Sequence, residues 1–128
     1  MNEKRNKYQS ILLIEDNLLS AKAAMSIMRA FNCYVDHAPD GQTALQMLKA
    51  KCYDLALVDV DLPDTTGIKL VAKIKASVSV KITKMDCIAL TGHASKKVSE
   101  ACKNSGMIKV LVKPLSSQVI IDALELAY

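Results

Sequence analysis

The sequence predicts a single α/β domain in which a five-stranded parallel sheet is covered by helices on both faces. Two observations lead to this fold class. Short apolar runs alternate along the chain with amphipathic stretches of helical period, a pattern typical of repeated strand–helix units. The central runs are apolar at every position, as expected for strands that are covered on both sides. We expect residues 1–128 to form one domain, because a chain of this length fits one domain and is too short for two well-packed ones. A domain of this size folds without disulfides or a structural metal.

The first half of the chain contains two strands and two helices by pattern. Residues 11–14 predict a buried strand, and residues 33–38 predict a second one whose apolar/polar alternation favours an edge position. Asn17 is expected to cap the helix between them. The inner face of that helix is expected to carry Leu19, Ala23, Ala24, Ile27, Met28 and Phe31. A turn at Pro39-Asp40-Gly41 leads into a helix with an apolar stripe of Ala44, Leu45, Leu48 and Cys52.

The second half continues the alternation. Strands are expected at residues 55–58, 87–90 and 107–112. A helix over residues 67–76 faces inward through Leu70, Val71 and Ile74, and residues 77–84 are expected to be a loop. A weak, polar helix is expected over residues 95–104. Ser116 is expected to cap a last helix whose inward residues are Val119, Ile120, Ala123, Leu124 and Ala127.

Right-handed crossovers arrange these elements as a doubly wound (βα)5 sheet, with two helices on one face and three on the other. The expected strand order is 2-1-3-4-5, the flavodoxin-like order, whose switch point lies between strands one and three. The alternative Rossmann order usually brings a glycine fingerprint after the first strand. This chain has Glu15-Asp16-Asn17 there, and carboxylates at that turn would repel a pyrophosphate.

Composition and charge exclude several classes of protein. Hydrophobic residues make up 51% of the chain, too many for a disordered protein, and no apolar run approaches the roughly 20 residues that span a membrane. The net charge of +4 comes from scattered lysines, so we expect no nucleic-acid binding. The polar segment of residues 1–9 is expected to be a flexible tail. Too few apolar residues follow it for a signal peptide, so we expect a cytoplasmic protein.

The cysteines indicate no metal or disulfide framework. Cys33, Cys52, Cys87 and Cys102 show no CxxC motif and no zinc-site spacing. We therefore expect all four to be reduced and mostly buried packing residues.

Polar side chains follow four of the predicted strands. Glu15 and Asp16 follow the first strand, Asp59 the third, Thr91 the fourth and Lys113 the fifth. These side chains are expected to converge, because the carboxyl ends of parallel strands share one edge of the sheet. Three carboxylates in contact repel by on the order of 4 kcal/mol per pair at an effective dielectric constant of about 20. Either one carboxyl stays protonated or a cation binds, and Mg²⁺ suits a site with few protein ligands.

A site neutralised by Mg²⁺ and Lys113 can accept a phosphoryl group. Asp59 would be the nucleophile and would form an aspartyl phosphate, while Lys113 and the Thr91 hydroxyl would bind the other phosphoryl oxygens. Each feature alone has an ordinary structural explanation, such as an acidic pair near a helix N-terminus or an aspartate in a turn. Their joint occurrence at the ends of successive strands favours the functional interpretation.

The motifs at these positions resemble those of the receiver domain of two-component response regulators, over residues 10–128. The matching segments read ILLIEDN, DLALVDVDLPDTTG, CIALTGHA and VLVKPL. The resemblance implies that Asp59 is phosphorylated by a sensor histidine kinase or a histidine phosphotransfer domain. It implies a Mg²⁺ site formed by Asp16, Asp59 and the backbone carbonyl of Asp61, with Glu15 binding through water.

The resemblance also implies a cis peptide bond between Lys113 and Pro114. Phosphorylation would draw in Thr91 and Lys113 and reshape the face formed by residues 95–104, 107–112 and 116–127. That face is also the expected surface for a homodimer. On this basis the domain is a phosphoacceptor that assists its own phosphorylation and dephosphorylation rather than an enzyme.

Three features depart from the family pattern. Val110 stands where many receiver domains have Tyr or Phe, and the net charge is positive where many are acidic. Asp61 adds a carboxylate beside the acceptor. We expect Asp61 and His93 to modulate hydrolysis of the phosphoryl group, and the small Gly92 to leave that group open to attack.

Two other functions and one question of context stay open. Asp59-Val60-Asp61 could serve a small phosphohydrolase of the haloacid-dehalogenase type, although those enzymes usually carry this motif on the first strand and add a cap domain. The domain could also be an interaction module that is never phosphorylated. The stretch KPLSSQVIIDAL resembles receivers of hybrid sensor kinases, so we expect that origin rather than a stand-alone regulator.

Overall fold

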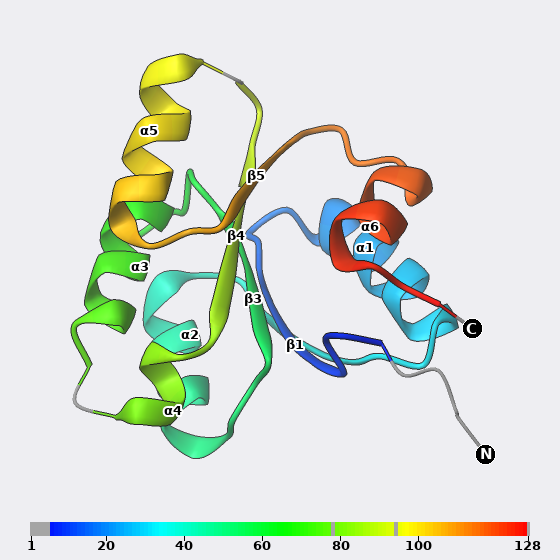
Figure 1. The fold of residues 1–128 in the computed structure, drawn as a ribbon, viewed down its shortest axis with the longest axis horizontal. Coiled ribbons are helices and arrows are strands. Elements are labelled where there is room, and N and C mark those ends of the chain that lie inside the picture. The colour runs from blue at the N-terminus through cyan, green and yellow to red at the C-terminus, as the bar shows by residue number, and fades with distance from the viewer. Residues whose placement is uncertain (1–5, 78, 94, 128) are drawn as a thin grey trace.

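The computed structural model describes residues 6–77, 79–93 and 95–127 and contains one five-stranded parallel sheet. Its strand order is β2-β1-β3-β4-β5, which confirms the predicted order (Figure 1). The strands are β1 (Ser10–Ile14), β2 (Tyr34–Ala38), β3 (Leu55–Asp59), β4 (Asp86–Thr91) and β5 (Lys109–Val112). The helices are α1 (Leu18–Ala30), α2 (Gly41–Ala50), α3 (Gly67–Lys75), α4 (Val80–Thr83), α5 (Lys96–Ser105) and α6 (Ser117–Leu124).

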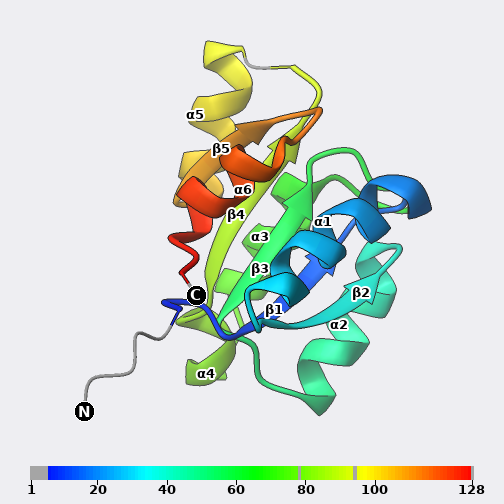
Figure 2. The same cartoon turned by 90° about the vertical axis from the view of Figure 1, so that its right-hand side faces the viewer.

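Helices cover both faces of the sheet, as predicted. α1 and α6 lie on one face, and α2, α3 and α5 lie on the other (Figures 1 and 2). Each face of the sheet has its own hydrophobic core, and alternate residues of β1 belong to different cores. Ile11 and Leu13 pack towards α1 and α6, and Leu12 and Ile14 pack towards α2 and α3. Because every residue of β3 is also buried, the residue that ends this strand, Asp59, is held at the carboxyl edge by a rigid core.

Two predicted helix caps are confirmed. The Asn17 side chain accepts a hydrogen bond from the backbone N–H of Ser20 at 2.9 Å, and Ser116 accepts one from Val119 at 3.2 Å. Asp40, expected in a turn, caps α2 by accepting from the N–H of Thr43. In the part of the chain that the structure describes, no helix is long and apolar enough to cross a bilayer.

The predicted inner faces of two helices were partly wrong. In α1 the buried residues are Ala21, Ala24, Met25 and Met28, whereas Ala23 is exposed and Leu19 is 81% exposed. In α6, Val119 is 38% exposed. Leu19 and Val119 lie in the first turns of their helices and are exposed, although their spacing fits the predicted inner faces.

Two further local predictions were wrong. The predicted loop over residues 77–84 contains the short helix α4, although residue 78 lies outside the described residues. The Lys75 ammonium donates hydrogen bonds to the carbonyls of Thr83 and Met85, at 3.0 and 2.6 Å, and so holds the end of this helix. Cys52 lies beyond the end of α2 and is exposed, whereas Cys33, Cys87 and Cys102 are buried free thiols, as predicted.

The expected flexible tail does not include residues 6–9. Tyr8 is buried, and its hydroxyl donates to Asp86 at 2.6 Å. The side chain of Asn6 donates to the carbonyl of Phe31 and accepts from the N–H of Ala127, at 2.7 and 2.8 Å. These contacts are made with segments far along the chain, so the local polar sequence could not predict them. Residues 1–5 lie outside the described residues.

Candidate functional site

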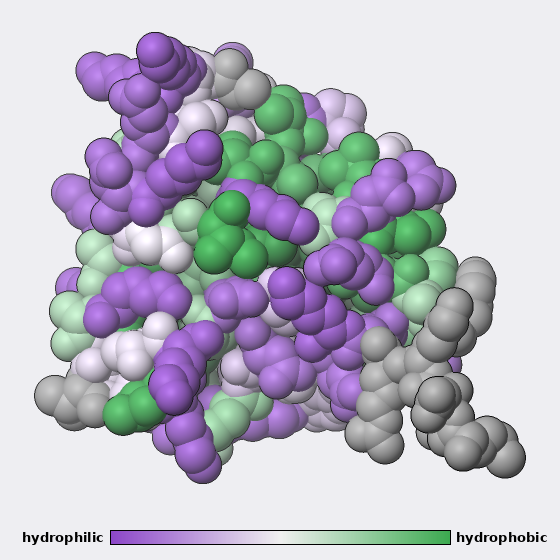
Figure 3. Space-filling view, in the orientation of Figure 1, coloured by the Kyte–Doolittle hydropathy of each residue, from purple (hydrophilic) through white to green (hydrophobic). Residues whose placement is uncertain are grey.

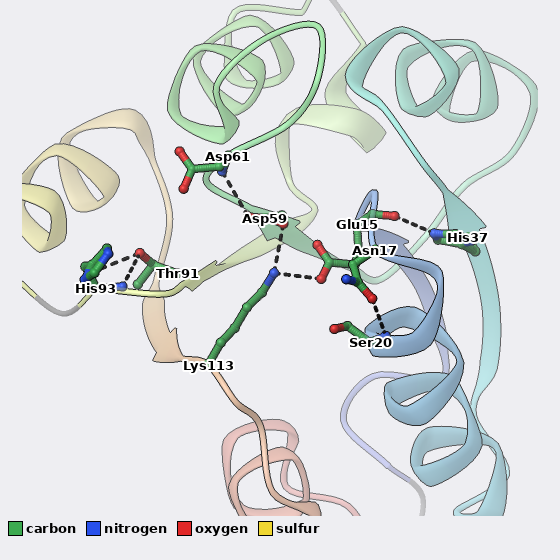
Figure 4. A network of polar contacts seen from close by, with 9 residues as sticks. All are labelled: Glu15, Asn17, Ser20, His37, Asp59, Asp61, Thr91, His93 and Lys113. Atoms are coloured by element: carbon green, nitrogen blue, oxygen red, sulfur yellow. Dashed lines mark hydrogen bonds and ion pairs between the residues drawn. The ribbon is translucent and has the colours of Figure 1, made fainter.

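The predicted acidic residues and the lysine meet at the carboxyl edge of the sheet. Glu15 follows β1, Asp59 ends β3, and Lys113 follows β5 (Figure 4). The Lys113 ammonium donates to Glu15 Oε1 at 2.7 Å and to Asp59 Oδ2 at 2.8 Å. Both carboxylates are buried, with residue exposures of 1% for Glu15 and 5% for Asp59. Three strands thus bring one cation and two anions into direct contact.

The site has the donor set of a hard divalent cation. Glu15, Asp16 and Asp59 each offer one carboxylate oxygen, and these oxygens lie within 4.8 Å of one another. Glu15 Oε2 is buried and has no hydrogen-bond partner among the described residues. A buried carboxylate oxygen without a donor is costly, so these residues fit a cation with oxygen ligands such as Mg²⁺.

The two buried carboxyl groups differ in proton affinity. Burial raises the pKa of Glu15 to about 7, and the neighbouring Asp59 carboxylate adds to this rise. Burial also acts to raise the pKa of Asp59. The neighbouring Glu15 carboxyl, the Lys113 ammonium and the backbone N–H of Asp61 outweigh that effect and hold the pKa of Asp59 below its usual value. In the absence of a metal ion, the pair therefore binds a proton more readily at Glu15 than at Asp59.

The loop after β3 wraps closely around Asp59. The backbone N–H of Asp61 donates to Asp59 Oδ1 at 2.9 Å, and the Asp61 side chain is exposed. The N–H of Gly67 donates to the carbonyl of Val60 at 2.7 Å. A Cβ at Gly67 would collide with the carbonyl oxygen of Asp59, so only glycine lets α3 begin this close to the end of β3.

Thr91 is the predicted site residue whose side chain does not join the cluster. Its hydroxyl donates to the carbonyl of His93 at 3.1 Å and accepts from the N–H of the same residue at 3.2 Å (Figure 4). Its backbone carbonyl nevertheless accepts from the N–H of Lys113 at 2.7 Å, which ties β4 to β5 beside the site. His93 is exposed, and a Cβ at Gly92 would meet no atom within 4 Å. The peptide bond between Lys113 and Pro114 is cis, as the resemblance implied.

Two residues near the site were missed in the sequence. The ring Nε2 of His37 lies 2.6 Å from the backbone carbonyl of Glu15. The carboxylate of Asp64 accepts from the backbone N–H groups of Gly41 and Gln42, both at 2.9 Å. His37 lies outside the quoted motif segments, and Asp64 lies within DLALVDVDLPDTTG at a position to which no role was assigned. The predicted 2-1 strand order was the available signal for His37, because it places the end of β2 beside Glu15.

The sequence profile of the response regulator receiver domain matches residues 11–125. The chain belongs to this family. The receiver domain is 37% identical over 110 residues to the aerobic respiration control sensor protein ArcB of Escherichia coli, covering 84% of this chain and 14% of that protein. It is 34% identical over 120 residues to the hybrid signal transduction histidine kinase M of Dictyostelium discoideum, covering 90% of this chain and 5% of that protein. The chain spans only a small part of the length of these relatives. Its similarity to hybrid kinases agrees with the resemblance to hybrid-kinase receivers found in the sequence.

Solved structures carry the same fold. The receiver domain of a sensor histidine kinase of Pseudomonas aeruginosa superposes with a TM-score of 0.81 at 29% identity, covering 91% of this chain and 94% of that one. That structure holds a magnesium ion in its active-site cleft. The chemotaxis response regulator CheY4 of Vibrio cholerae superposes with a TM-score of 0.84 at 22% identity, covering 90% of this chain and 94% of that one, and shows the fold alone.

Proposed function

We propose that this receiver domain is the phosphoacceptor of a two-component phosphorelay, and that Asp59 takes a phosphoryl group from a phosphohistidine in a Mg²⁺-dependent reaction. The donor is a sensor histidine kinase or a histidine phosphotransfer domain, and the receiver belongs to a hybrid kinase chain located in the cytoplasm. One observation carries the proposal: the buried side chain of Asp59 lies 2.8 Å from the Lys113 ammonium, within a cluster of three carboxyl groups.

We assign the metal ligands from the same cluster. Asp16, Asp59 and the backbone carbonyl of Asp61 hold Mg²⁺, and Glu15 reaches it through water. When bound, Mg²⁺ neutralises charge on the phosphoryl oxygens as the phosphoryl group moves. The unpartnered, buried Glu15 Oε2 supports this assignment, because a metal-bound water would supply the missing donor.

The transfer exchanges one bond to phosphorus for another. A carboxylate oxygen of Asp59 attacks phosphorus, the P–N bond of the phosphohistidine breaks, and the imidazole leaves with that electron pair. Lys113 already lies between Glu15 and Asp59, so its ammonium needs only a short movement to contact a phosphoryl oxygen. The exposed carboxylate of Asp61 and the exposed His93 then modulate the attack of water on the aspartyl phosphate.

The switch requires Thr91 to change partners. Its hydroxyl must leave both bonds to the His93 backbone to reach a phosphoryl oxygen. The hydrogen bond between the Lys113 N–H and the Thr91 carbonyl passes that movement to β5. Hydrophobic side chains gather over β5 and α6 among hydrophilic ones (Figure 3), and Ile108, Val112 and Val119 are exposed near this face. The face formed by α5, β5 and α6 is therefore the proposed homodimer surface.

Phosphorylation with acetyl phosphate and Mg²⁺, followed by intact-protein mass spectrometry, tests the proposal. We expect one phosphoryl group per chain in the wild type, none after Asp59→Asn, and one after the control change Asp40→Asn, which keeps the cap of α2. Equal labelling of Asp59→Asn and wild type would refute the assignment. Repeated turnover of p-nitrophenyl phosphate would instead support the phosphohydrolase alternative, and failure to bind beryllofluoride with Mg²⁺ would support the unphosphorylated interaction module.

A further inference from the structure

Residues 37–42, which comprise the end of β2, the turn after it and the start of α2, contact both loops that carry the proposed metal ligands. The first contact is with the β1–α1 loop. The carbonyl of Glu15 accepts from the ring Nε2–H of His37 at 2.6 Å, and the N–H of Glu15 donates to the carbonyl of Ala38 at 3.0 Å (Figure 4). Because a carbonyl can only accept, the His37 ring carries its proton on Nε2 in this contact. Both backbone polar groups of Glu15 are thus held by β2.

The second contact is with the loop after β3, which carries Asp61. Asp64 of this loop accepts hydrogen bonds from the first two backbone N–H groups of α2, those of Gly41 and Gln42. The loop also packs tightly on α2, since a Cβ at Gly41 would lie 2.6 Å from the side chain of Thr65. A carboxylate at a helix N-terminus is favoured by the helix dipole as well as by the hydrogen bonds.

We infer that the segment of residues 37–42 fixes the relative position of the two loops that carry the proposed metal ligands. The positioning residues are His37, which holds the β1–α1 loop, and Asp64, through which the loop after β3 binds the start of α2. This inference rests on the proposed function, because it concerns the Mg²⁺ site assigned there. The Glu15 carbonyl belongs to the peptide group that leads directly into Asp16, so its bond to His37 sets the direction in which the Asp16 side chain leaves the loop. Asp64 lies three residues after Asp61 and restrains the backbone that presents the Asp61 carbonyl.

The physical argument is one of preorganisation. A site with few protein ligands depends on how closely those ligands are held, and groups that orient metal ligands commonly change affinity by 10- to 100-fold when removed. His37 is half-buried, and its bond to Glu15 is short, whereas Asp64 is exposed to water. We therefore expect the His37 contact to have the larger effect of the two.

The test measures Mg²⁺ affinity of the unphosphorylated domain by titration followed through the amide NMR signals of Asp16 and Asp61. We expect His37→Leu to weaken Mg²⁺ binding roughly ten-fold, at the lower end of the range for such groups. We expect Asp64→Ala to weaken it about three-fold, below that range, because Asp64 is exposed to water. His37→Gln, whose side-chain amide can donate to the Glu15 carbonyl, is expected to restore most of the affinity.

Each variant has a matched control. Asp36 lies in β2 beside His37. Tyr53→Phe removes the 2.5 Å hydrogen bond from the Tyr53 hydroxyl to Asp36, so it disturbs β2 without touching the β1–α1 loop. Asp40→Ala removes the other carboxylate at the start of α2 without touching the loop after β3. Both controls are expected to bind Mg²⁺ like the wild type, with urea unfolding reporting any loss of stability.

The outcomes separate the inference from the proposed function. Mg²⁺ affinities of His37→Leu and Asp64→Ala equal to those of their controls would overturn the inference alone. If His37→Leu does not fold, the comparison of Asp64→Ala with Asp40→Ala and of His37→Gln with wild type decides the matter. A wild-type domain that binds no Mg²⁺ would overturn the proposed function, and this inference with it.

Discussion

The two halves of the site differ in how far they are already assembled. On the side of β1 and β3, Glu15, Asp59 and Lys113 are joined by hydrogen bonds of 2.7 and 2.8 Å and lie against buried strands. On the side of β4 and α5, the Thr91 hydroxyl bonds to the turn at His93, and Cys102 is the buried residue of its helix. In the proposed function the first half needs only a short movement of the Lys113 ammonium, whereas the second requires the Thr91 hydroxyl to leave both bonds to the His93 backbone.

This difference has a thermodynamic basis. Buried charges are stable only when they are paired, so the half that holds the carboxylates must be rigid. A segment that buries little apolar surface opens at low cost, which suits an element that changes its position. The receiver domain thus places its proposed chemistry at the ends of buried strands, whereas α5, on the side of the proposed switch, buries only Cys102.

The largest expected difference in stability between the two halves comes from removing the cation of the half that hydrogen bonds already join. Lys113→Met leaves two buried carboxylates without their partner, and we expect the free energy of unfolding to fall by about 3 kcal/mol in metal-free buffer at pH 8. Thr91→Val keeps the side-chain shape and loses two hydrogen bonds to an exposed turn, so we expect a loss of under about 1 kcal/mol. Urea unfolding measures both, and equal losses would show that the two halves are equally interlocked.

The pH dependence of stability sharpens the comparison. The pKa of Glu15 is about 7 in the folded state, above the ordinary value of 4.5, so the folded state binds the proton more tightly than the unfolded state. Its contribution to stability is therefore present below pH about 4.5 and is lost as the pH rises to about 7. The lowered pKa of Asp59 acts in the opposite direction, but only near and below its ordinary value of 3.8.

Between pH 5 and 8 in metal-free buffer, we accordingly expect the wild type to lose on the order of 2 kcal/mol of stability. Glu15→Gln cannot titrate and is expected to show a much flatter profile, and saturating Mg²⁺ is expected to flatten the wild-type profile as well. Thr91→Val provides the control and should retain the wild-type slope. Urea midpoints at several pH values measure these slopes, and a wild type that gains stability over this range would contradict the assignment of the proton to Glu15.

The smallest expected effect concerns the helix caps of the two halves. Asn17→Ala removes the cap of α1, which buries four residues, and should lower global stability by about 1 kcal/mol. Ser95→Ala removes the cap of α5 and should speed amide exchange mainly within that helix, because α5 opens without unfolding the sheet. Hydrogen exchange read residue by residue distinguishes the two, and a uniform change across the domain in both variants would show that α5 is not a separate unit.

Much of the site was predictable because its residues stand at strand ends. Apolar runs such as residues 11–14 and 55–58 identify the central strands, and parallel pairing then brings the residues that follow them to one edge. The convergence of Glu15, Asp59 and Lys113 therefore followed from local patterns and one topological rule. The partners of the Thr91 hydroxyl did not follow, because the bonds to His93 depend on the path of the loop after β4.

Helix faces show the same limit. The spacing of apolar residues in α1 allowed two neighbouring faces, and the chain alone could not decide between Leu19 and Met25 as core residues. The choice depends on where the helix meets the sheet. Lys75 holds the end of α4 through carbonyls eight and ten residues away, and no hydrophobic pattern records such a contact.

The sequence by itself determined the order of the strands and of the helices other than α4, the caps at Asn17 and Ser116, and the set of charged residues at the carboxyl edge. These features depend on neighbouring residues and on the handedness of the chain. Only the tertiary structure decided that His37 holds the carbonyl of Glu15, that Asp64 holds the start of α2, and that the pKa of Glu15 is raised while the pKa of Asp59 is lowered. Those outcomes depend on burial and on distances between segments far apart in the chain, since both hydrogen-bond strength and proton affinity vary with the surrounding packing.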